Sequence, residues 1–190
     1  MKPRILLVDC FDSFTHNIFH YLDDLNRGNC HVVRYDKFNP DDLANFSHFL
    51  ISPGPGLPVD YPLISQALST YAMTKRILGV CLGLQAIVVH FGGSLLLLDR
   101  VMHGRATTIR FSPSPLFRGL ESPLLAGHYH SWVANEEGFP ACLKVTSKNE
   151  GGLIMSLEHR SLPIHGFQFH PESVMTEGGK AMLANWLSLK

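Results

Sequence analysis

A cysteine flanked by two glycines stands where an apolar run gives way to a helical pattern. Residues 77–80 are apolar, Gly79 and Gly83 flank Cys81, and apolar positions with helical spacing resume over residues 82–91. This order predicts a strand, a sharp turn and a helix, which is the thiol version of the nucleophile elbow. The positive end of the helix would favour the thiolate form of Cys81. A buried structural cysteine is the alternative for this spacing taken alone.

A histidine and a carboxylate stand two residues apart near the end of the chain. His170 and Glu172 flank Pro171 and follow the β-like run 164–169. In an extended segment, residues i and i+2 point to the same side, so the carboxylate could hold one imidazole nitrogen and leave the other for a thiol. Together with Cys81 they would supply a nucleophile, a base and a group that orients the base. Without Cys81, a surface turn would be the simpler interpretation.

A loop of prolines and glycines follows the apolar run 49–51. Residues 52–56 read Ser-Pro-Gly-Pro-Gly, one predicted strand before the cysteine turn. Glycines held between prolines form a rigid loop whose backbone N–H groups could point at a ligand oxygen, as an oxyanion hole requires. An ordinary tight turn is the alternative, because Pro-Gly pairs mostly mark turns.

The composition is that of a globular protein with balanced charge. The 190 residues include 16 basic and 16 acidic residues, and 17% are charged. This balance lacks the basic excess of nucleic-acid-binding proteins. No apolar run approaches the roughly 20 residues of a membrane-spanning helix, and the first residues lack a secretory cleavage site. We therefore expect a single domain over residues 1–190 that is cytoplasmic and has no nucleic-acid or membrane partner.

Scattered cysteines and abundant histidines raise the question of metal binding. The four cysteines form no Cys-x-x-Cys pair, which argues against structural zinc and disulfides and indicates a reducing compartment. His128 and His130 would share one side of an extended segment, but no third ligand stands at suitable spacing. We expect no metal site. Instead, residues 128–132 are predicted to form a loop that lines a substrate site, and residues 102–105 are predicted to form a second loop.

Strand-like and helical patterns alternate through the first half of the chain. Apolar runs predict strands at 5–8, 31–35, 49–51 and 77–80, and helical spacing predicts helices ending near 28, over 62–73 and over 82–91. Five short β-like runs follow, and residues 178–180 open a last helix. The chain therefore predicts an α/β fold with a mostly parallel central sheet, flanking helices and an added antiparallel β segment. Working groups of such sheets gather at the carboxyl ends of the strands.

Four motifs, in this order, resemble those of the class I, triad-type glutamine amidotransferases. They are SPGPG at 52–56, GVCLGLQ at 79–85, YHS at 129–131 and QFHPES at 168–173. Within that class the chain is similar to the small subunit, component II, of anthranilate synthase or aminodeoxychorismate synthase. Residues 8–15 and 102–104 also resemble this subgroup, with Cys10 standing where an asparagine is usual. The resemblance runs from about Ile5 to the C-terminal helix.

This resemblance implies an enzyme that hydrolyses L-glutamine. Cys81 would attack the side-chain amide and form a glutamyl thioester, His170 would protonate the departing nitrogen, and Glu172 would hold the imidazole in the useful tautomer. The N–H groups of Gly56 and Leu82 would form the oxyanion hole. The implied substrate-binding residues are Gly54, Pro55, Gly56, Gln85, Ser131 and Trp132.

The resemblance also implies a partner. Ammonia would pass to a chorismate-binding synthase subunit, component I, within a hetero-oligomer that makes anthranilate or 4-amino-4-deoxychorismate, for tryptophan or folate biosynthesis. No metal or organic cofactor is implied for the glutaminase half of the reaction.

Two other functions remain open at this point. A free-standing cysteine hydrolase of γ-glutamyl or ester substrates could use the same three side chains, and it would be fully active alone. A non-catalytic interaction subunit would require a broken triad or a blocked pocket, but all three triad residues are present in the sequence.

Overall fold

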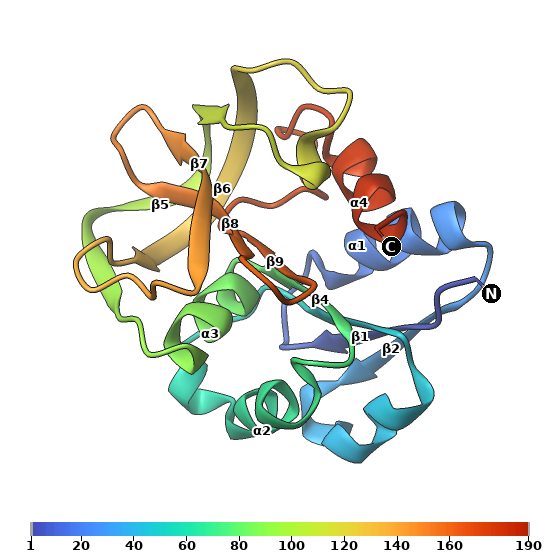
Figure 1. Ribbon diagram of the computed structural model, residues 1–190. Helices are drawn as coiled ribbons and strands as arrows, with labels where there is room; N and C mark the ends of the chain where they lie inside the picture. The colour runs from blue at the N-terminus through green and yellow to red at the C-terminus, as the bar shows by residue number, and fades with distance from the viewer. Residues whose placement is uncertain (1, 190) are drawn as a thin grey trace.

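The computed structural model describes residues 2–189 and shows a nine-stranded sheet with helices on both faces (Figure 1). The strands are β1 (Ile5–Asp9), β2 (Cys30–Arg34), β3 (His48–Ile51), β4 (Arg76–Val80), β5 (Leu95–Phe111), β6 (Leu124–Ala134), β7 (Leu143–Asn149), β8 (Ile154–His159) and β9 (Ile164–Phe167). The α-helices are α1 (Thr15–Asn26), α2 (Pro62–Tyr71), α3 (Leu82–His90) and α4 (Gly179–Leu187). Short 3₁₀ turns span Tyr35–Lys37, Pro40–Asn45, Pro58–Asp60 and Pro115–Phe117.

The sheet has a parallel half and an antiparallel half. Its strand order is β2-β1-β3-β4-β9-β8-β7-β5-β6. The first five strands in this order pair in parallel, and every later pair is antiparallel. The predicted fold class, a parallel central sheet with flanking helices and an added antiparallel segment, is therefore confirmed.

Helices cover both faces of the parallel half, and this explains why its strands read as unbroken apolar runs. In Figure 1, α1 and α4 lie on one side of these strands and α2 and α3 lie on the other. Along β1, Leu6 and Val8 pack into the core beneath α2 and α3, whereas Ile5 and Leu7 pack into the core beneath α1 and α4. Alternate residues of a strand point to opposite faces, so both kinds of position must be apolar.

The carboxyl ends of the central strands meet at one edge of the sheet. Ile51 of β3 is in register with Gly79 of β4, and Val80 of β4 is in register with Phe167 of β9. The segments that follow these strands therefore begin side by side. As expected, the segments after β1, β3 and β4, at 9–15, 52–58 and 81–85, lie at this edge, and residues 168–172 after β9 start there too.

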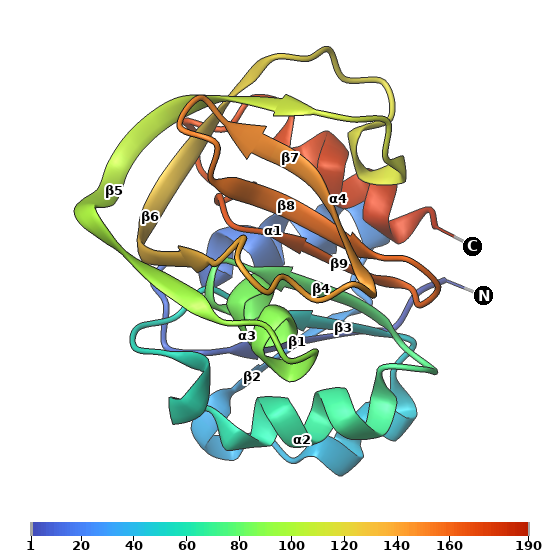
Figure 2. The same cartoon turned by 60° about the vertical axis from the view of Figure 1, so that its left-hand side comes forward.

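The two loops predicted at 102–105 and 128–132 are both strand, so these predictions were wrong. Residues 95–111 form one long strand, β5, which pairs with β6 through two register shifts near Met102 and Gly104. Pairing with β6 on both sides of the first shift, up to Leu97 and again from Met102, continues the strand through a stretch where the sequence gives no strand signal. Figure 2 shows this pair as a long curved ribbon at one side of the molecule.

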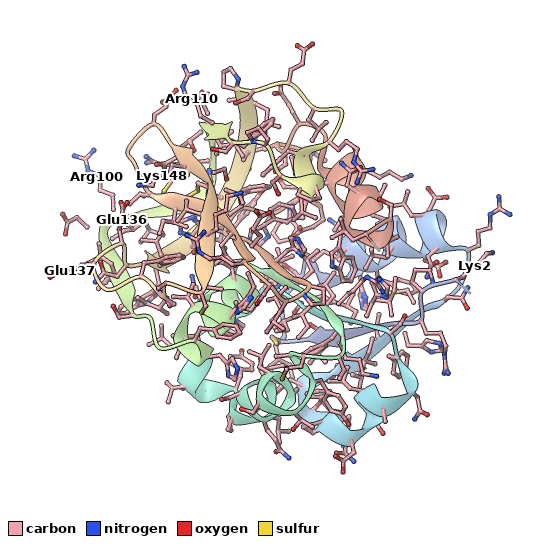
Figure 3. All side chains as sticks on the ribbon, in the orientation of Figure 1. Lys2, Arg100, Arg110, Glu136, Glu137 and Lys148 are labelled. Carbon is pink, nitrogen blue, oxygen red and sulfur yellow. The ribbon has the colours of Figure 1, made fainter. Side chains whose placement is uncertain are left out.

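Charged side chains lie on the outside of the antiparallel half. Figure 3 shows Arg100, Arg110 and Glu137 projecting away from the strands. Lys148 and Glu136 form an exposed ion pair at 2.5 Å, an interaction that contributes at most about 1 kcal/mol at a surface. None of the helices between residues 2 and 189 has the length and hydropathy of a membrane span.

Candidate active site

Cys81 occupies a strained turn between β4 and α3. Its φ and ψ angles are 52° and −102°, a conformation that a non-glycine residue rarely adopts and that costs on the order of 1–3 kcal/mol. Its N–H donates to the Phe167 carbonyl at 2.7 Å. A Cβ on Gly79 would lie 2.3 Å from the Gly83 backbone, and one on Gly83 would lie 2.5 Å from the Ile51 carbonyl oxygen. Both flanking glycines are therefore required by close backbone contact, as the elbow geometry demands.

His170 and Glu172 form a buried pair beside this turn. His170 Nδ1 lies 2.6 Å from Glu172 Oε1, and the two residues are 1% and 2% exposed. They converge because the chain turns at Pro171, with the Ser173 N–H donating to the His170 carbonyl at 3.1 Å. The prediction that they converge is confirmed. The reason given for it was wrong, because the segment is a turn and not an extended strand.

The electrostatic environment of His170 favours its charged form. Burial lowers the pKa of His170, but polar interactions with Cys81 and Glu172 and the negative charge that each can carry outweigh it and raise the pKa to about 10. At neutral pH the ring is therefore an imidazolium that Glu172 stabilises. Within residues 2–189, Nε2 of His170 makes no well-directed hydrogen bond, so this nitrogen remains available to a reacting group.

Contacts with Tyr61 and residue 10 hold the loop of residues 52–56 in place. The Tyr61 hydroxyl donates to the Pro55 carbonyl at 3.0 Å and lies 3.2 Å from the Cys10 carbonyl. A Cβ on Gly54 would lie 2.5 Å from that same Cys10 oxygen. Glycine is therefore required at 54 so that the loop can pack closely against residue 10.

Two backbone N–H groups near the thiol have no acceptor. Leu82 is the first residue of α3, so its N–H has no partner within the helix. Gly56 has a φ of 73°, and the following N–H, that of Leu57, donates to Asp60 Oδ2 at 2.8 Å. In the described part of the chain, neither the Gly56 nor the Leu82 N–H makes a hydrogen bond. Both donors are therefore free to bind an oxygen atom.

A cavity of about 460 Å³ opens over Cys81. All six residues predicted to bind substrate line it, as do Cys81 and two further residues of the segment 128–132, which was predicted to line a substrate site. Four other lining residues were not predicted. The lining residues are Gly54, Pro55, Gly56, Leu57, Asp60, Cys81, Gln85, Val101, His103, Tyr129, His130, Ser131 and Trp132. The last four come from β6, so a strand and not a loop forms this wall.

Gln85 presents a fixed amide to the cavity. Its Nε2 donates to the Trp132 carbonyl at 2.8 Å and lies 3.4 Å from Gln168 Oε1. Its Oε1 has no hydrogen-bond partner in residues 2–189 and is not among the fully enclosed atoms. This oxygen can therefore accept a hydrogen bond from a ligand.

Aromatic rings pack around His170. The ring of Tyr129 lies 4.8 Å from the imidazole, and the ring of Phe14 lies 5.6 Å from it, both edge to face. The Tyr129 hydroxyl lies 3.2 Å from Ser173 Oγ, and His103 packs edge-on against the other side of Tyr129 at 5.2 Å. Tyr129 of β6 and Phe14 thereby pack the imidazole in place.

His128 and His130 contact each other. His130 Nε2 lies 3.4 Å from His128 Nδ1, and His128 Nε2 lies 2.8 Å from Thr107 Oγ1. Burial and the nearby charge of His170 lower the pKa of His128 to about 4, and burial with the charges of His128 and His170 lowers the pKa of His130 to about 3. Across residues 2–189, no three His, Cys, Asp or Glu side chains gather in a possible metal site. The two histidines are neutral at pH 7 and take part in a hydrogen-bonded network.

The comparison with known families decides the class of this protein. Residues 6–189 match the family model of class-I glutamine amidotransferases. The chain belongs to this family. The turn at Cys81 and the buried His170–Glu172 pair therefore lie within an amidotransferase domain that spans nearly the whole chain.

Relatives of this amidotransferase include proteins that are named as components of synthases. A Haemophilus influenzae protein, provisionally named anthranilate synthase component II, is 43% identical, and the match covers 98% of this chain and 96% of the relative. The aminodeoxychorismate/anthranilate synthase component 2 of Bacillus subtilis is 40% identical over 96% of this chain and 95% of its own. A Thermoplasma acidophilum crystal structure, described as that of a GMP synthase subunit, has a TM-score of 0.88. That match covers 98% of this chain and 93% of the other at 22% identity, so it shows the shared fold.

Two contacts of this amidotransferase site were not predicted, although Gln168 lies in the motif at 168–173 and Tyr129 lies in the predicted substrate-lining segment 128–132. Gln168, which is fully buried, places its Nε2 3.7 Å from Cys81 Sγ, and Tyr129 packs on His170. Both residues belong to motifs noted in the sequence, two positions from His170 and Ser131 respectively. That closeness along the chain was the signal that could have identified them as site residues. Their contacts span long sequence separations that a linear pattern does not reveal.

Proposed function

We propose that this amidotransferase is the glutaminase subunit of a chorismate-aminating synthase, with Cys81, His170 and Glu172 as its catalytic triad. The observation that carries the proposal is the buried His170–Glu172 pair, 2.6 Å apart, beside a cysteine that opens into a cavity of about 460 Å³. The names of the relatives, components II of anthranilate and aminodeoxychorismate synthases, support the partner.

In the first step, the sulfur of Cys81 attacks the side-chain amide carbon of glutamine. A C–S bond forms, and the carbonyl π electrons move to oxygen. The unpaired N–H groups of Gly56 and Leu82 would bind this oxyanion. They are fixed before the reaction, and the loss of one such donor typically costs about 3 kcal/mol of barrier.

In the second step, His170 acts as an acid. Its imidazolium, which a pKa of about 10 maintains at neutral pH, gives a proton to the amide nitrogen. The C–N bond breaks, ammonia leaves, and a γ-glutamyl thioester remains on Cys81. Glu172 stabilises the positive ring before the transfer and holds Nδ1, so that Nε2 faces the reacting atoms.

In the third step, the now neutral His170 takes a proton from water. The hydroxide attacks the thioester carbonyl, and the collapse of the second tetrahedral intermediate breaks the C–S bond. The product leaves as the γ-carboxylic acid of glutamate and gives its proton to solvent, where the released ammonia takes one up. The thiolate of Cys81 with the imidazolium of His170 is thereby restored. Charge and protons balance over the cycle.

The substrate's α-amino and α-carboxylate groups would lie at the far end of the cavity from the thiol. Gln85 Oε1 is an acceptor suited to the α-ammonium group, because its amide nitrogen is already held by Trp132. Asp60, which also lines the cavity, supplies a second acceptor. Ser131 and the N–H of Gly54 can donate to the α-carboxylate, whereas Pro55 has no N–H and the Gly56 N–H is assigned to the oxyanion.

Ammonia would pass to a chorismate-binding subunit in a hetero-oligomer. The free-standing hydrolase is not favoured, since both relatives named above are components of larger synthases. A partner-dependent rise in glutaminase activity would therefore be expected.

The test compares wild-type protein with Cys81→Ser, each with and without the chorismate-binding partner. We expect the partner to raise glutamate release by the wild type, and Cys81→Ser to abolish it in both states. Cys142→Ser is the matched control, because Cys142 is a free thiol that does not line the cavity. Near wild-type glutamate release by Cys81→Ser would contradict the assignment, and the aromatic amine formed from chorismate would identify the product.

A further inference from the structure

The sulfur of Cys81 receives a hydrogen bond from a residue outside the triad. Gln168 comes directly after β9 and is 0% exposed, and its Nε2 lies 3.7 Å from Cys81 Sγ. The preceding residue, Phe167, accepts the Cys81 N–H at 2.7 Å. Residues 167 and 168 thus hold both the backbone and the side chain of the nucleophile.

Neighbouring groups fix which end of the Gln168 amide faces the sulfur. The Trp132 carbonyl can only accept a hydrogen bond, so Gln85 must turn its NH₂ group toward it, at 2.8 Å. That NH₂ group also lies 3.4 Å from the Gln168 amide. A donor on Gln85 requires an acceptor on Gln168, so Gln168 turns its oxygen toward Gln85. The NH₂ of Gln168 is therefore left to point at Cys81 Sγ.

The backbone and the neighbouring residues hold Gln168 in this orientation. Its N–H donates to the Met155 carbonyl at 2.9 Å, and its neighbours Phe167 and Phe169 are both fully buried. The side-chain amide of Gln168, which is itself fully buried, is therefore a directed donor. Such a donor stabilises negative charge on the atom it faces more than it stabilises a neutral thiol.

We propose that Gln168 is a positioning residue that donates a hydrogen bond to the Cys81 sulfur, holding it in line with the cavity and favouring its reactive, negatively charged form. This proposal rests on the proposed role of Cys81 as the nucleophile. Gln168 does not line the cavity, so it acts through the sulfur and not through contact with glutamine. Its loss should lower kcat and leave KM nearly unchanged.

Two substitutions test this role. Gln168→Met keeps the length of the side chain but removes the donor, and Gln168→Glu keeps the shape but places a carboxylate beside the sulfur. Asn185→Leu is the matched control, because it removes an amide that donates two hydrogen bonds, to Leu116 and Arg118, away from the site.

The first readout is the rate at which iodoacetamide alkylates Cys81, followed on the peptide that contains it, from pH 5 to pH 10. We expect both Gln168 variants to react about tenfold more slowly at neutral pH, with profiles displaced to higher pH and the larger displacement in Gln168→Glu. The second readout is glutaminase kinetics, in which kcat should fall about 10- to 100-fold while KM changes less than about threefold. Asn185→Leu should leave both readouts at wild-type values.

Alkylation profiles and kcat within about twofold of wild type in both Gln168 variants would overturn the proposal. Melting temperatures below the assay temperature in both variants would also overturn the proposal, because they would show that Gln168 is needed for folding. The alkylation profile needs no turnover. A wild-type protein that releases no glutamate would therefore count against the proposed function, while the profile would still test the role of Gln168 separately.

Discussion

The imidazole Nδ1 of His170 lies 2.6 Å from Oε1 of Glu172, and both side chains are almost completely buried. A short turn at Pro171 brings them together, so the pair is built within one segment of chain. The other carboxylate oxygen of Glu172 has no partner within residues 2–189. A buried carboxylate with so little other support depends on the imidazolium for its stability.

Replacing Glu172 with glutamine should disable this pair without changing its shape. Against the opposing effect of burial, the hydrogen bond and charge of Glu172 help raise the pKa of His170 to about 10. We expect Glu172→Gln to lower that pKa and to reduce kcat by about 10²- to 10⁴-fold. The measurement is kcat against pH for both proteins. A variant that retains the wild-type profile would show that Glu172 has no role in orienting or charging His170.

Gly83→Ala should destabilise the protein and impair the site together. The new Cβ would lie 2.5 Å from the Ile51 carbonyl oxygen and 2.9 Å from the Ile51 Cβ, so α3 must move away from β3. We expect a loss of about 1–3 kcal/mol in the free energy of unfolding, measured by urea denaturation. Gly151→Ala is the control, because its nearest contact would be 3.5 Å away. Equal stabilities of the two variants would contradict the close packing of the elbow.

Gln85→Leu should weaken substrate binding. The substitution removes the free Oε1 acceptor and the bond from Nε2 to the Trp132 carbonyl, which fixes the cavity wall. We expect KM for glutamine to rise by about tenfold or more, since each lost hydrogen bond to a charged group is worth about 1.5–3 kcal/mol. Steady-state kinetics measure this change. An unchanged KM would mean that Gln85 does not contact the substrate.

Buried histidines should make the protein less stable in acid. Burial and the charge of Arg76 lower the pKa of His48 to about 4, so between pH 6.5 and about 4 the unfolded chain binds a proton that the folded chain does not. Stability from this residue is therefore present above pH 6.5 and is lost as the pH falls, by at most about 1.4 kcal/mol per pH unit.

The experiment compares the slope of unfolding free energy against pH for wild type, His48→Asn and His20→Asn. His20 is exposed, so its variant should keep the wild-type slope, whereas His48→Asn should flatten it. The same acid loss is expected from His128 and His165, whose pKa values burial also lowers to about 4. Identical slopes in all three proteins would show that His48 is charged in the folded state.

The strand, turn and helix around Cys81 could be predicted because local signals agreed. An apolar run, two glycines and a helical pattern each specify one part of the turn, and parallel strands place their carboxyl ends together. The long strand β5 could not be predicted in this way. Asp99, Arg100 and Gly104 interrupt its apolar pattern, and pairing with β6 through two register shifts overrides that local signal.

Sequence patterns did not predict contacts between residues that are far apart along the chain. Gln168 and Cys81 are 87 positions apart, and only the parallel pairing of β4 with β9 brings them together. Tyr129 packs on His170 although β6 lies four strands away from β9 in the order of the sheet. Residue type and spacing suggested the proposed triad, whereas the residues that support it emerge only from the fold.

The covalent intermediate on Cys81 provides the most direct test of the central claim. Wild-type protein would be mixed with glutamine, quenched in acid within the first turnovers, digested and examined by mass spectrometry. We expect a γ-glutamyl group on the peptide containing Cys81, absent when Cys81 is replaced by serine and absent from the peptide containing Cys142. Steady glutamate release with no modification of Cys81 at any quench time, or with the group on another residue, would contradict the proposed mechanism.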